Sequence, residues 1–238
     1  MQELEATQSQ YTFALESIKQ QKIEDVMSRL TARLRIINSV SITEKDFFMV
    51  CGEMKGYGYS VWRMDPDLKN PVNVLSKLGG CCGQMDVQAS GNRLVVAENT
   101  KHRVGQYDRT GKPTGNFGKA GRDESVADTF GGCCNPMNCR LCANGDVYTS
   151  ESEGIIKKFN AKGEFLGLIG VVKLEGGCKN VAVAASPSGD KVYLCDQPGS
   201  KIVILQQRSP EEMKAAAEQQ KAAASKSGLD TLLKFLLQ

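Results

Sequence analysis

Histidine and aromatic side chains are scarce in this sequence of 238 residues, which has one His, one Trp and 6% aromatic residues in all. A single histidine cannot build a His-rich metal centre, and His102 lies in the turn-like stretch NTKHR, where an exposed loop residue is the expected state. We therefore expect no Ser-His-Asp triad. The low aromatic content and the 24 glycines favour a turn-rich, all-β body.

A strong excess of either charge is also absent. The 30 basic and 27 acidic residues give a net charge of +3, and aromatic residues do not alternate with the basic ones, so a nucleic-acid partner is not expected. No run of about 18 apolar residues is present, so we expect no transmembrane helix. The first ten residues are polar and do not resemble a signal peptide. We expect a cytoplasmic protein if this N-terminus is complete, and a periplasmic one if a leader has been removed.

A repeated pattern of short strands fills the middle of the chain. It is clearest in Gly131–Gly170, where the strand-like runs CRLCA, DVYTSE, IIKKFN and FLGLIG are separated by turn sequences that include Asn-Gly. The first strands of four such repeats start near Val40, Val87, Cys139 and Val181, which are 47, 52 and 42 residues apart. Repeats of four short strands at this spacing are typical of β-propeller blades, so we predict a propeller of about four blades over residues 36–208.

The last repeat has three strand-like runs instead of four, namely NVAVAA, KVYLCD and KIVILQ. A closed propeller has no free sheet edge, so the missing strand is expected to come from another part of the assembly. The segment near Arg33–Ile37 could supply it, and so could a second subunit.

Both ends of the chain have helical rather than strand patterns. Residues 1–35 contain no Gly or Pro and place apolar residues at helical spacing, which predicts an amphipathic helical extension. Residues 209–238 begin with the capping sequence Ser-Pro-Glu-Glu, continue through an Ala/Lys-rich spacer and end in LDTLLKFLLQ, which has a short leucine-rich face. These apolar faces favour docking onto a protein surface or oligomerisation.

The stretch VVAENTKHRVGQYDRTGKPTGNFG (Val95–Gly118) resembles an NHL repeat, and the third repeat keeps the same frame. Such repeats have an inner strand, a V-A-D/E-x-x-N-x-R-I/V-like segment, a Y/F-D-x-x-G turn and a final strand that ends in Gly. With GCCGQMD and GGCCNPMN added, the chain resembles a bacterial group of NHL-type propellers that have Cys-Cys signatures and no assigned reaction. The resemblance covers about Ser39–Gln206. It implies an NHL-type propeller that binds proteins or RNA, and the catalytic patterns of the family's lyases and hydrolases are not found here.

Five of the nine cysteines occupy the same place in three repeats, directly after Gly-Gly and before the inner strand. In a propeller this loop lies at the mouth of the central channel, so equivalent loops of successive blades converge there. Met, Asp and Asn residues follow within a few positions and are expected close by. The cysteines are Cys81, Cys82, Cys133, Cys134 and Cys178, and the residues that follow them are Met85, Asp86, Met137, Asn138 and Asn180.

Three chemical states of these cysteines are open. Vicinal disulfides Cys81–Cys82 and Cys133–Cys134 would be strained and easily reduced, because adjacent Cα atoms are closer than a disulfide prefers. The thiolates could instead bind a soft metal ion, Cu or Zn, or an iron–sulfur cluster. In the third state the cysteines are small apolar residues that fill tight blade junctions beside Gly.

The remaining cysteines are predicted to be structural. Cys139 and Cys142 form a C-x-x-C sequence on a strand, where positions i and i+3 point to opposite faces and cannot readily share one site. Cys51 and Cys195 lie at the ends of second strands and are expected in the core.

Acidic residues also recur at the ends of second strands, as Glu98, Glu151 and Asp196. Such side chains often bond to the backbone of the loop that follows, and we expect this turn role here.

Two functions are consistent with these features. The first is a non-enzymatic propeller scaffold for protein–protein interaction. Its helical ends would dock it onto another protein or join it to a second copy of the chain. The alternative is a redox or metal-binding activity of the clustered cysteines at the channel mouth, because a vicinal pair can switch between dithiol and disulfide without large motion elsewhere. No catalytic residue is assigned in either case.

Overall fold

The computed structural model describes residues 34–53, 57–81, 84–121, 128–132, 134–174, 181–197, 199–206, 208–209 and 211–212. The chain divides into two compact units, Met1–Ile204 and Leu205–Gln238, and the first contains every described strand except the last two residues of β17 (Lys201–Gln206). The helical extensions predicted for 1–35 and 209–238 fall almost entirely outside the described residues. Within those residues, no helix has the length and apolar character needed to cross a membrane.

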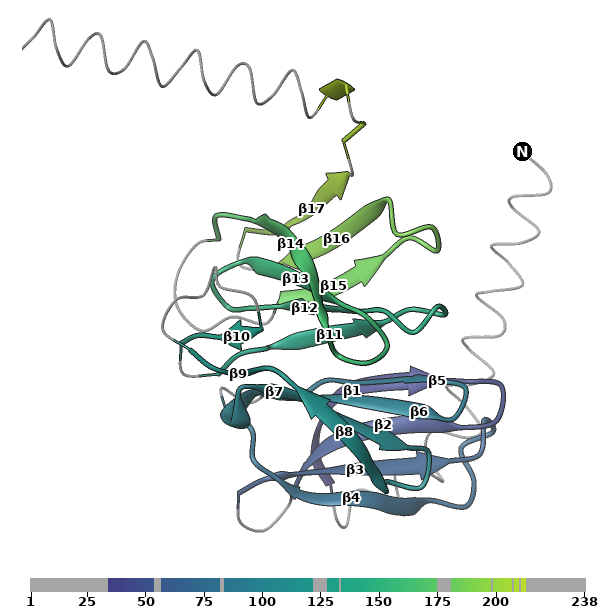
Figure 1. Ribbon diagram of the computed structural model, residues 1–238. Coiled ribbons are helices and arrows are strands. Elements are labelled where there is room, and N and C mark those ends of the chain that lie inside the picture. Colours follow the sequence, from purple (N-terminus) through teal and green to yellow (C-terminus); the bar gives the residue numbers. More distant parts are fainter. Residues whose placement is uncertain are drawn as a thin grey trace, which may run out of the picture. The chain divides into compact units, whose positions relative to one another are not determined.

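Four antiparallel sheets follow one another along the chain (Figure 1). The first blade comprises β1 (Leu34–Ile42), β2 (Phe47–Glu53), β3 (Tyr59–Met64) and β4 (Val72–Leu78). The second comprises β5 (Val87–Ser90), β6 (Arg93–Glu98), β7 (Arg103–Asp108) and β8 (Pro113–Phe117), with the 3-10 helix η1 (Asn99–Lys101) between β6 and β7. The third comprises β11 (Asn138–Leu141), β12 (Val147–Ser150), β13 (Ile155–Phe159) and β14 (Phe165–Val171). The last comprises β15 (Val181–Ala185), β16 (Lys191–Asp196) and β17 (Lys201–Gln206).

Each sheet is a meander, because its strands lie side by side in sequence order. The first strands of successive blades contact one another, β1 with β5, β5 with β11 and β11 with β15. This arrangement is that of an all-β propeller with four blades, and it confirms the fold class predicted from the repeats.

The structure corrects one prediction about the last blade. The segment from Leu34 onward belongs to β1 and pairs with β2 of the first blade, Leu34 with Glu53 and Ile37 with Cys51. The described part of the Arg33–Ile37 segment therefore does not complete the last sheet, which has three strands among the described residues. The alternation of apolar residues continues into Leu34, which is why β1 starts two residues earlier than predicted.

A second difference is a short parallel pair, β9 (Lys119–Ala120) with β10 (Thr129–Phe130), which the repeats did not predict. It lies between the second and third blades in sequence. Two residues per strand are too few to leave a periodic signal in the sequence.

The hydrophobic core lies between neighbouring blades. Phe48 and Val50 of the first blade pack with Leu94 and Val96 of the second in one cluster. A further cluster joins the second and third blades and contains Val95, Ala97, Val104, Phe117, Phe130, Cys139, Leu141, Val147 and Phe159. Successive residues of β6 thus face opposite neighbours, so an inner blade is apolar on both faces.

Candidate functional site

The loop that carries Cys81 is held by the side chain of Asn99, which follows β6. The Cys81 backbone N–H donates to Asn99 Oδ1 at 3.0 Å, and Asn99 Nδ2 donates to the Gln84 carbonyl at 2.9 Å. Asn99 is fully buried, so these bonds satisfy polar groups that water does not reach. The asparagine therefore fixes the entry to the inner strand of the second blade.

The corresponding loop of the third blade is held in a different way. Asn135 Nδ2 donates to the Gly131 carbonyl at 3.1 Å and to Glu153 Oε2 at 2.7 Å, and its Oδ1 accepts from the Ser152 N–H at 2.8 Å. Cys134, beside Asn135, is completely buried. The two Gly-Gly-Cys loops thus share their place in the blade but are fixed by asparagines from different sequence positions.

Asp86 lies at the junction of three inner strands. Its Oδ2 accepts the Cys139 N–H of β11 at 2.9 Å, and its Oδ1 accepts the hydroxyl of Ser39 from β1. Asp86 is 2% exposed, and burial raises the pKa of its carboxyl above the ordinary value. The hydrogen bonds from Ser39 and Cys139 lower this pKa, but the effect of burial is larger. Asp86 belongs to the second blade, and its carboxyl group is bonded to both the first and the third blade. Its role is therefore structural.

The other predicted neighbours of the cysteines lie in similar surroundings. Met85 packs in the core between the first two blades, and Met137 is 1% exposed. Asn138 Oδ1 accepts the Val183 N–H at 3.4 Å and so connects the inner strands of the third and fourth blades. In the described structure these residues are part of the packing around the inner strands.

Three of the five predicted cysteines, Cys82, Cys133 and Cys178, lie outside the described residues, as does Asn180. Within the part of the chain that is described, no three His, Cys, Asp or Glu side chains lie close enough together to hold a metal ion. The cysteine cluster and the vicinal disulfides therefore stay predictions.

Two of the remaining cysteines are buried free thiols. Burial raises the pKa of Cys51 to about 12, and burial together with the nearby Asp86 charge raises the pKa of Cys139 well above its ordinary value. Both stay protonated near neutral pH and are poor nucleophiles, as expected for structural residues. Cys195 differs from the prediction, because it is exposed on β16 instead of lying in the core.

The acidic residues at the ends of second strands do more than the predicted turn role. Glu98 is 1% exposed and accepts bonds from the Tyr107 hydroxyl at 2.5 Å, Lys101 Nζ at 2.6 Å and Arg103 Nη2 at 3.1 Å. Burial alone would raise the pKa of Glu98, but the bonds from Lys101 and Tyr107 and the charge of Arg103 outweigh it, and the pKa is lowered. Glu98 is thus an ionised carboxylate inside the blade.

The same position forms ion pairs in the next two blades. Glu151 and Lys157 are both fully buried, with 2.8 Å between Oε1 and Nζ, and Lys157 also donates to the Thr129 carbonyl. Asp196 is buried and lies 3.4 Å from Lys201 Nζ. The sequence carried a signal that the turn interpretation missed, because each acidic residue is followed five or six positions later by Arg or Lys.

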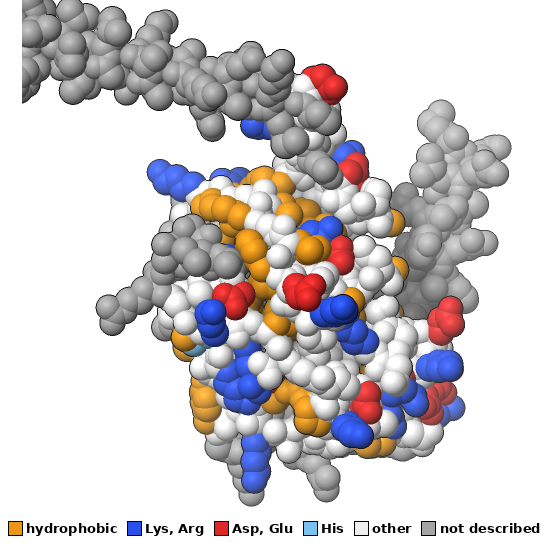
Figure 2. Space-filling model, in the orientation of Figure 1, with side chains coloured by type: hydrophobic (Ala, Val, Ile, Leu, Met, Phe, Trp, Pro, Cys, Tyr) orange, Lys and Arg blue, Asp and Glu red, His pale blue; other side chains and the backbone are white. Residues whose placement is uncertain are grey.

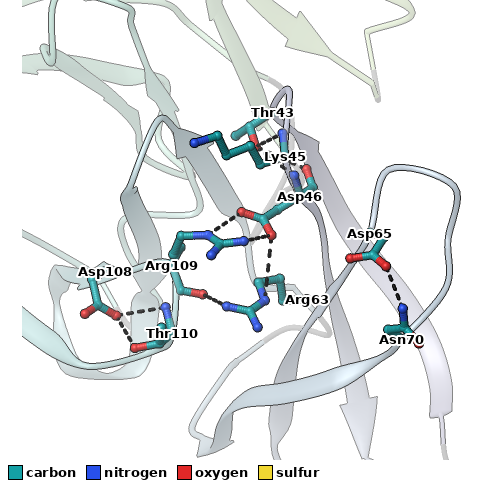
Figure 3. A network of polar contacts seen from close by, with 9 residues as sticks. All are labelled: Thr43, Lys45, Asp46, Arg63, Asp65, Asn70, Asp108, Arg109 and Thr110. Carbon is teal, nitrogen blue, oxygen red and sulfur yellow. Dashed lines mark hydrogen bonds and ion pairs between the residues drawn. The ribbon is translucent and has the colours of Figure 1, made fainter.

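A polar network joins the first two blades at their turns (Figure 3). The Arg109 guanidinium makes a bidentate ion pair with Asp46: Nε donates to Oδ2 at 2.7 Å and Nη2 donates to Oδ1 at 2.5 Å. Arg63 Nη1 donates to the Arg109 carbonyl at 3.2 Å. Asp46 is 2% exposed, so the pair ties a buried carboxylate to a neighbouring blade.

A hollow of about 680 Å³ opens beside this network. The β1–β2 turn and the β5–β6 turn line it, and Arg109 forms part of its wall. Arg109 is already engaged by Asp46, and Thr43 receives the N–H groups of its own turn at Lys45 and Asp46. The polar groups here mainly stabilise the turns, and we assign no ligand to the hollow.

These sheets and the core between them define the class of the protein as a four-bladed β-propeller. The sequence matches no protein-family model and no curated protein. Among solved structures, a protein of unknown function from Bacteroides thetaiotaomicron is similar with a TM-score of 0.52 and 15% identity, over 72% of this chain and 41% of that one. The calcium-binding protein regucalcin from Agrobacterium tumefaciens has a TM-score of 0.48 and 13% identity, over 72% of this chain and 62% of its own. The Dos1 propeller has a TM-score of 0.48 and 12% identity, over 73% and 43%.

The chain thus spans about two fifths of the length of the first of these proteins. At such identities the likeness shows the fold alone.

Proposed function

We propose that this protein is a non-enzymatic β-propeller of NHL type that serves as a scaffold for protein–protein interaction. In this proposal the helical ends predicted for 1–35 and 209–238 help to dock or oligomerise it. The observation that carries the proposal is an apolar surface on β14, the outer strand of the third blade. Four of its large side chains are exposed, namely Leu166, Leu168, Ile169 and Val171.

The outer strand of the second blade offers the contrast. The exposed residues of β8 are Pro113, Thr114, Gly115 and Asn116, which is an ordinary solvated edge. In Figure 2, hydrophobic side chains gather over the part of the molecule where Figure 1 draws β14. A contiguous apolar surface on a folded protein is typical of a protein-interaction site.

The pairing of β14 also supports a binding role. Its register with β13 shifts twice, between Ile156 and Lys157 and between Lys158 and Phe159. β-bulges of this kind twist an edge strand away from regular pairing with another chain. A partner would therefore contact the apolar side chains of β14 more readily than its backbone edge.

Photo-crosslinking tests this proposal. We would place benzoylphenylalanine at position 168 of the full-length protein in its own cells, and at position 116 on β8 as the matched outer-strand control. We expect discrete crosslinked protein adducts from position 168 that position 116 does not give and that Leu166→Asp abolishes. Identical adduct patterns from both positions would overturn the proposed role of β14.

A further inference from the structure

The second strands of the blades show that the last blade has a face on which no other described strand packs. Residues in the middle of β2, β6 and β12 are buried in succession, because these strands are covered on both faces. In β16 burial alternates instead: Val192, Leu194 and Asp196 are buried, whereas Cys195 is exposed. Among the residues that the structure describes, one face of the last blade is therefore covered and the other is open.

The covered face of the last blade points to the third blade. Ser150 Oγ donates to the Val181 carbonyl at 2.5 Å, and β15 contacts β11 and β12. Lys201, the first residue of β17, pairs with buried Asp196. Lys201 and every second residue after it on β17 therefore lie on the covered side. Ile202 and Ile204 consequently face the open side, where they are 67% and 58% exposed.

The open face is apolar, and its bulk is unevenly distributed. On β15 it presents Ala182 and Ala184, which pair with Cys195 and Tyr193 of β16. On β17 it presents the two isoleucines. The face thus has small side chains on the inner strand β15, Cys195 and half-buried Tyr193 on β16, and the two large isoleucines on the outer strand β17. Among the described residues of this face, charge is confined to its rim at Lys191, beside Asp190.

We infer that this open face binds the same face of a second copy of the chain. A two-fold axis parallel to the strands would place β15 of one copy over β17 of the other, and β16 over β16. The alanines of each copy would then receive the isoleucines of its partner, which is the large-into-small packing that sheet interfaces require. The symmetric, uncharged centre makes the face complementary to itself, and a copy is therefore the favoured occupant.

The size of the face sets the strength of the dimer. Three strands of about five residues cover roughly 14 Å by 16 Å at ordinary strand spacing and rise. The area of such a face is smaller than the about 800 Å² per partner that stable interfaces bury, so we expect a reversible dimer. The inference rests on the proposed function as a protein-binding scaffold and names one partner for it.

Light scattering of the full-length protein at increasing concentration tests the inference. We expect the mass to rise from 25.9 kDa at about 1 µM toward twice that value at a few hundred µM. The variant Ile202→Lys/Ile204→Lys should stay monomeric over the whole range. Val72→Lys, which changes an exposed β-branched residue of β4, should dimerise like the wild type.

The thiol of Cys195 gives a second, local readout. Its alkylation rate, followed by peptide mass spectrometry, should fall several-fold with rising protein concentration, whereas the rate of half-buried Cys142 in the third blade should stay constant. A protein that is monomeric at all concentrations would overturn the inference. A dimer that tolerates both lysines and leaves Cys195 equally reactive would overturn it too. The crosslinks expected from position 168 on β14 do not depend on either result. Failure of this inference and failure of the scaffold function are therefore distinguishable.

Discussion

Replacing Lys157 by methionine removes one partner of an ion pair that is closed off from water. Lys157 and Glu151 are both 0% exposed and lie 2.8 Å apart. Without the ammonium group, Glu151 keeps the Gly131 N–H at 3.3 Å but loses the opposite charge in a site that solvent does not reach. Removing one partner of a buried pair costs about 3–5 kcal/mol, because an uncompensated charge remains inside the protein.

The adjacent residue supplies a closely matched control. Lys158 lies 2.9 Å from Asp146 and 5.4 Å from the centre of the Tyr148 ring, and Lys157 lies 5.4 Å from the centre of the Phe130 ring. The two lysines differ mainly in burial, since Lys158 and Asp146 are 26% and 15% exposed. Solvent screens such a pair, so Lys158→Met should lower the free energy of unfolding by about 0–1 kcal/mol.

Thermal unfolding followed by circular dichroism would measure both variants. For a domain of this size 1 kcal/mol shifts Tm by about 2–4 °C, so Lys157→Met should lower Tm by about 6–20 °C and Lys158→Met by a few degrees at most. The double variant Glu151→Gln/Lys157→Met should recover most of the loss, because no unpaired charge remains while the glutamine can still accept the Gly131 N–H. Equal Tm losses for the two single variants would refute this reasoning.

Three further outcomes are expected. Arg109→Ala should lower the free energy of unfolding by about 1–3 kcal/mol in urea titrations, because it strips a buried carboxylate of two charged hydrogen bonds, and a loss no larger than that of exposed Lys112→Ala would contradict the blade-joining role. Gly154→Ala should lower Tm more than Gly91→Ala. Both glycines have positive φ, at +87° and +57°, but only at position 154 would the new methyl group meet a backbone carbonyl. Equal losses of Tm would contradict that clash. The raised pKa of Asp86 means that its protonated form is favoured in the folded state, so the stability of the wild type relative to Asp86→Asn should be greatest below the ordinary pKa of 3.8 and should fall as pH rises through the raised value. Urea midpoints of both proteins across this pH range would measure it, and a difference that is constant or grows with pH would contradict the burial effect.

The blades themselves could be predicted from the sequence because strands and hairpin turns are local features. A two-residue alternation and a turn such as Asn-Gly act over fewer than ten residues, and the predicted strands of the third blade differ from the observed ones by a residue or two at their ends. The capping sequence at Ser209 is local in the same way. It predicts Ser209 as a cap, and the Glu212 N–H donates to Ser209 Oγ at 3.2 Å. The Ser209 N–H also donates to Glu212 Oε2 at 2.7 Å.

The candidate site could be predicted less well, because its chemistry depends on contacts between blades. Repeat alignment placed Asp86 near the inner strands, but it could not show that the carboxyl would accept bonds from two other blades. Nor could it show that Glu151 would pair with Lys157, since turn chemistry explains the same residue type at the end of a strand.

Cys51 and Cys195 show most plainly where local sequence ends and tertiary structure begins. Both lie near the end of a second strand, directly after a run of apolar residues, and the sequence predicts one environment for both. In the fold Cys51 is buried and Cys195 is exposed. The sequence by itself determined that each residue sits on a strand and which neighbours share its face. Only the tertiary structure decided whether another layer covers that face, because burial is a property of the element packed against a strand and not of the strand itself.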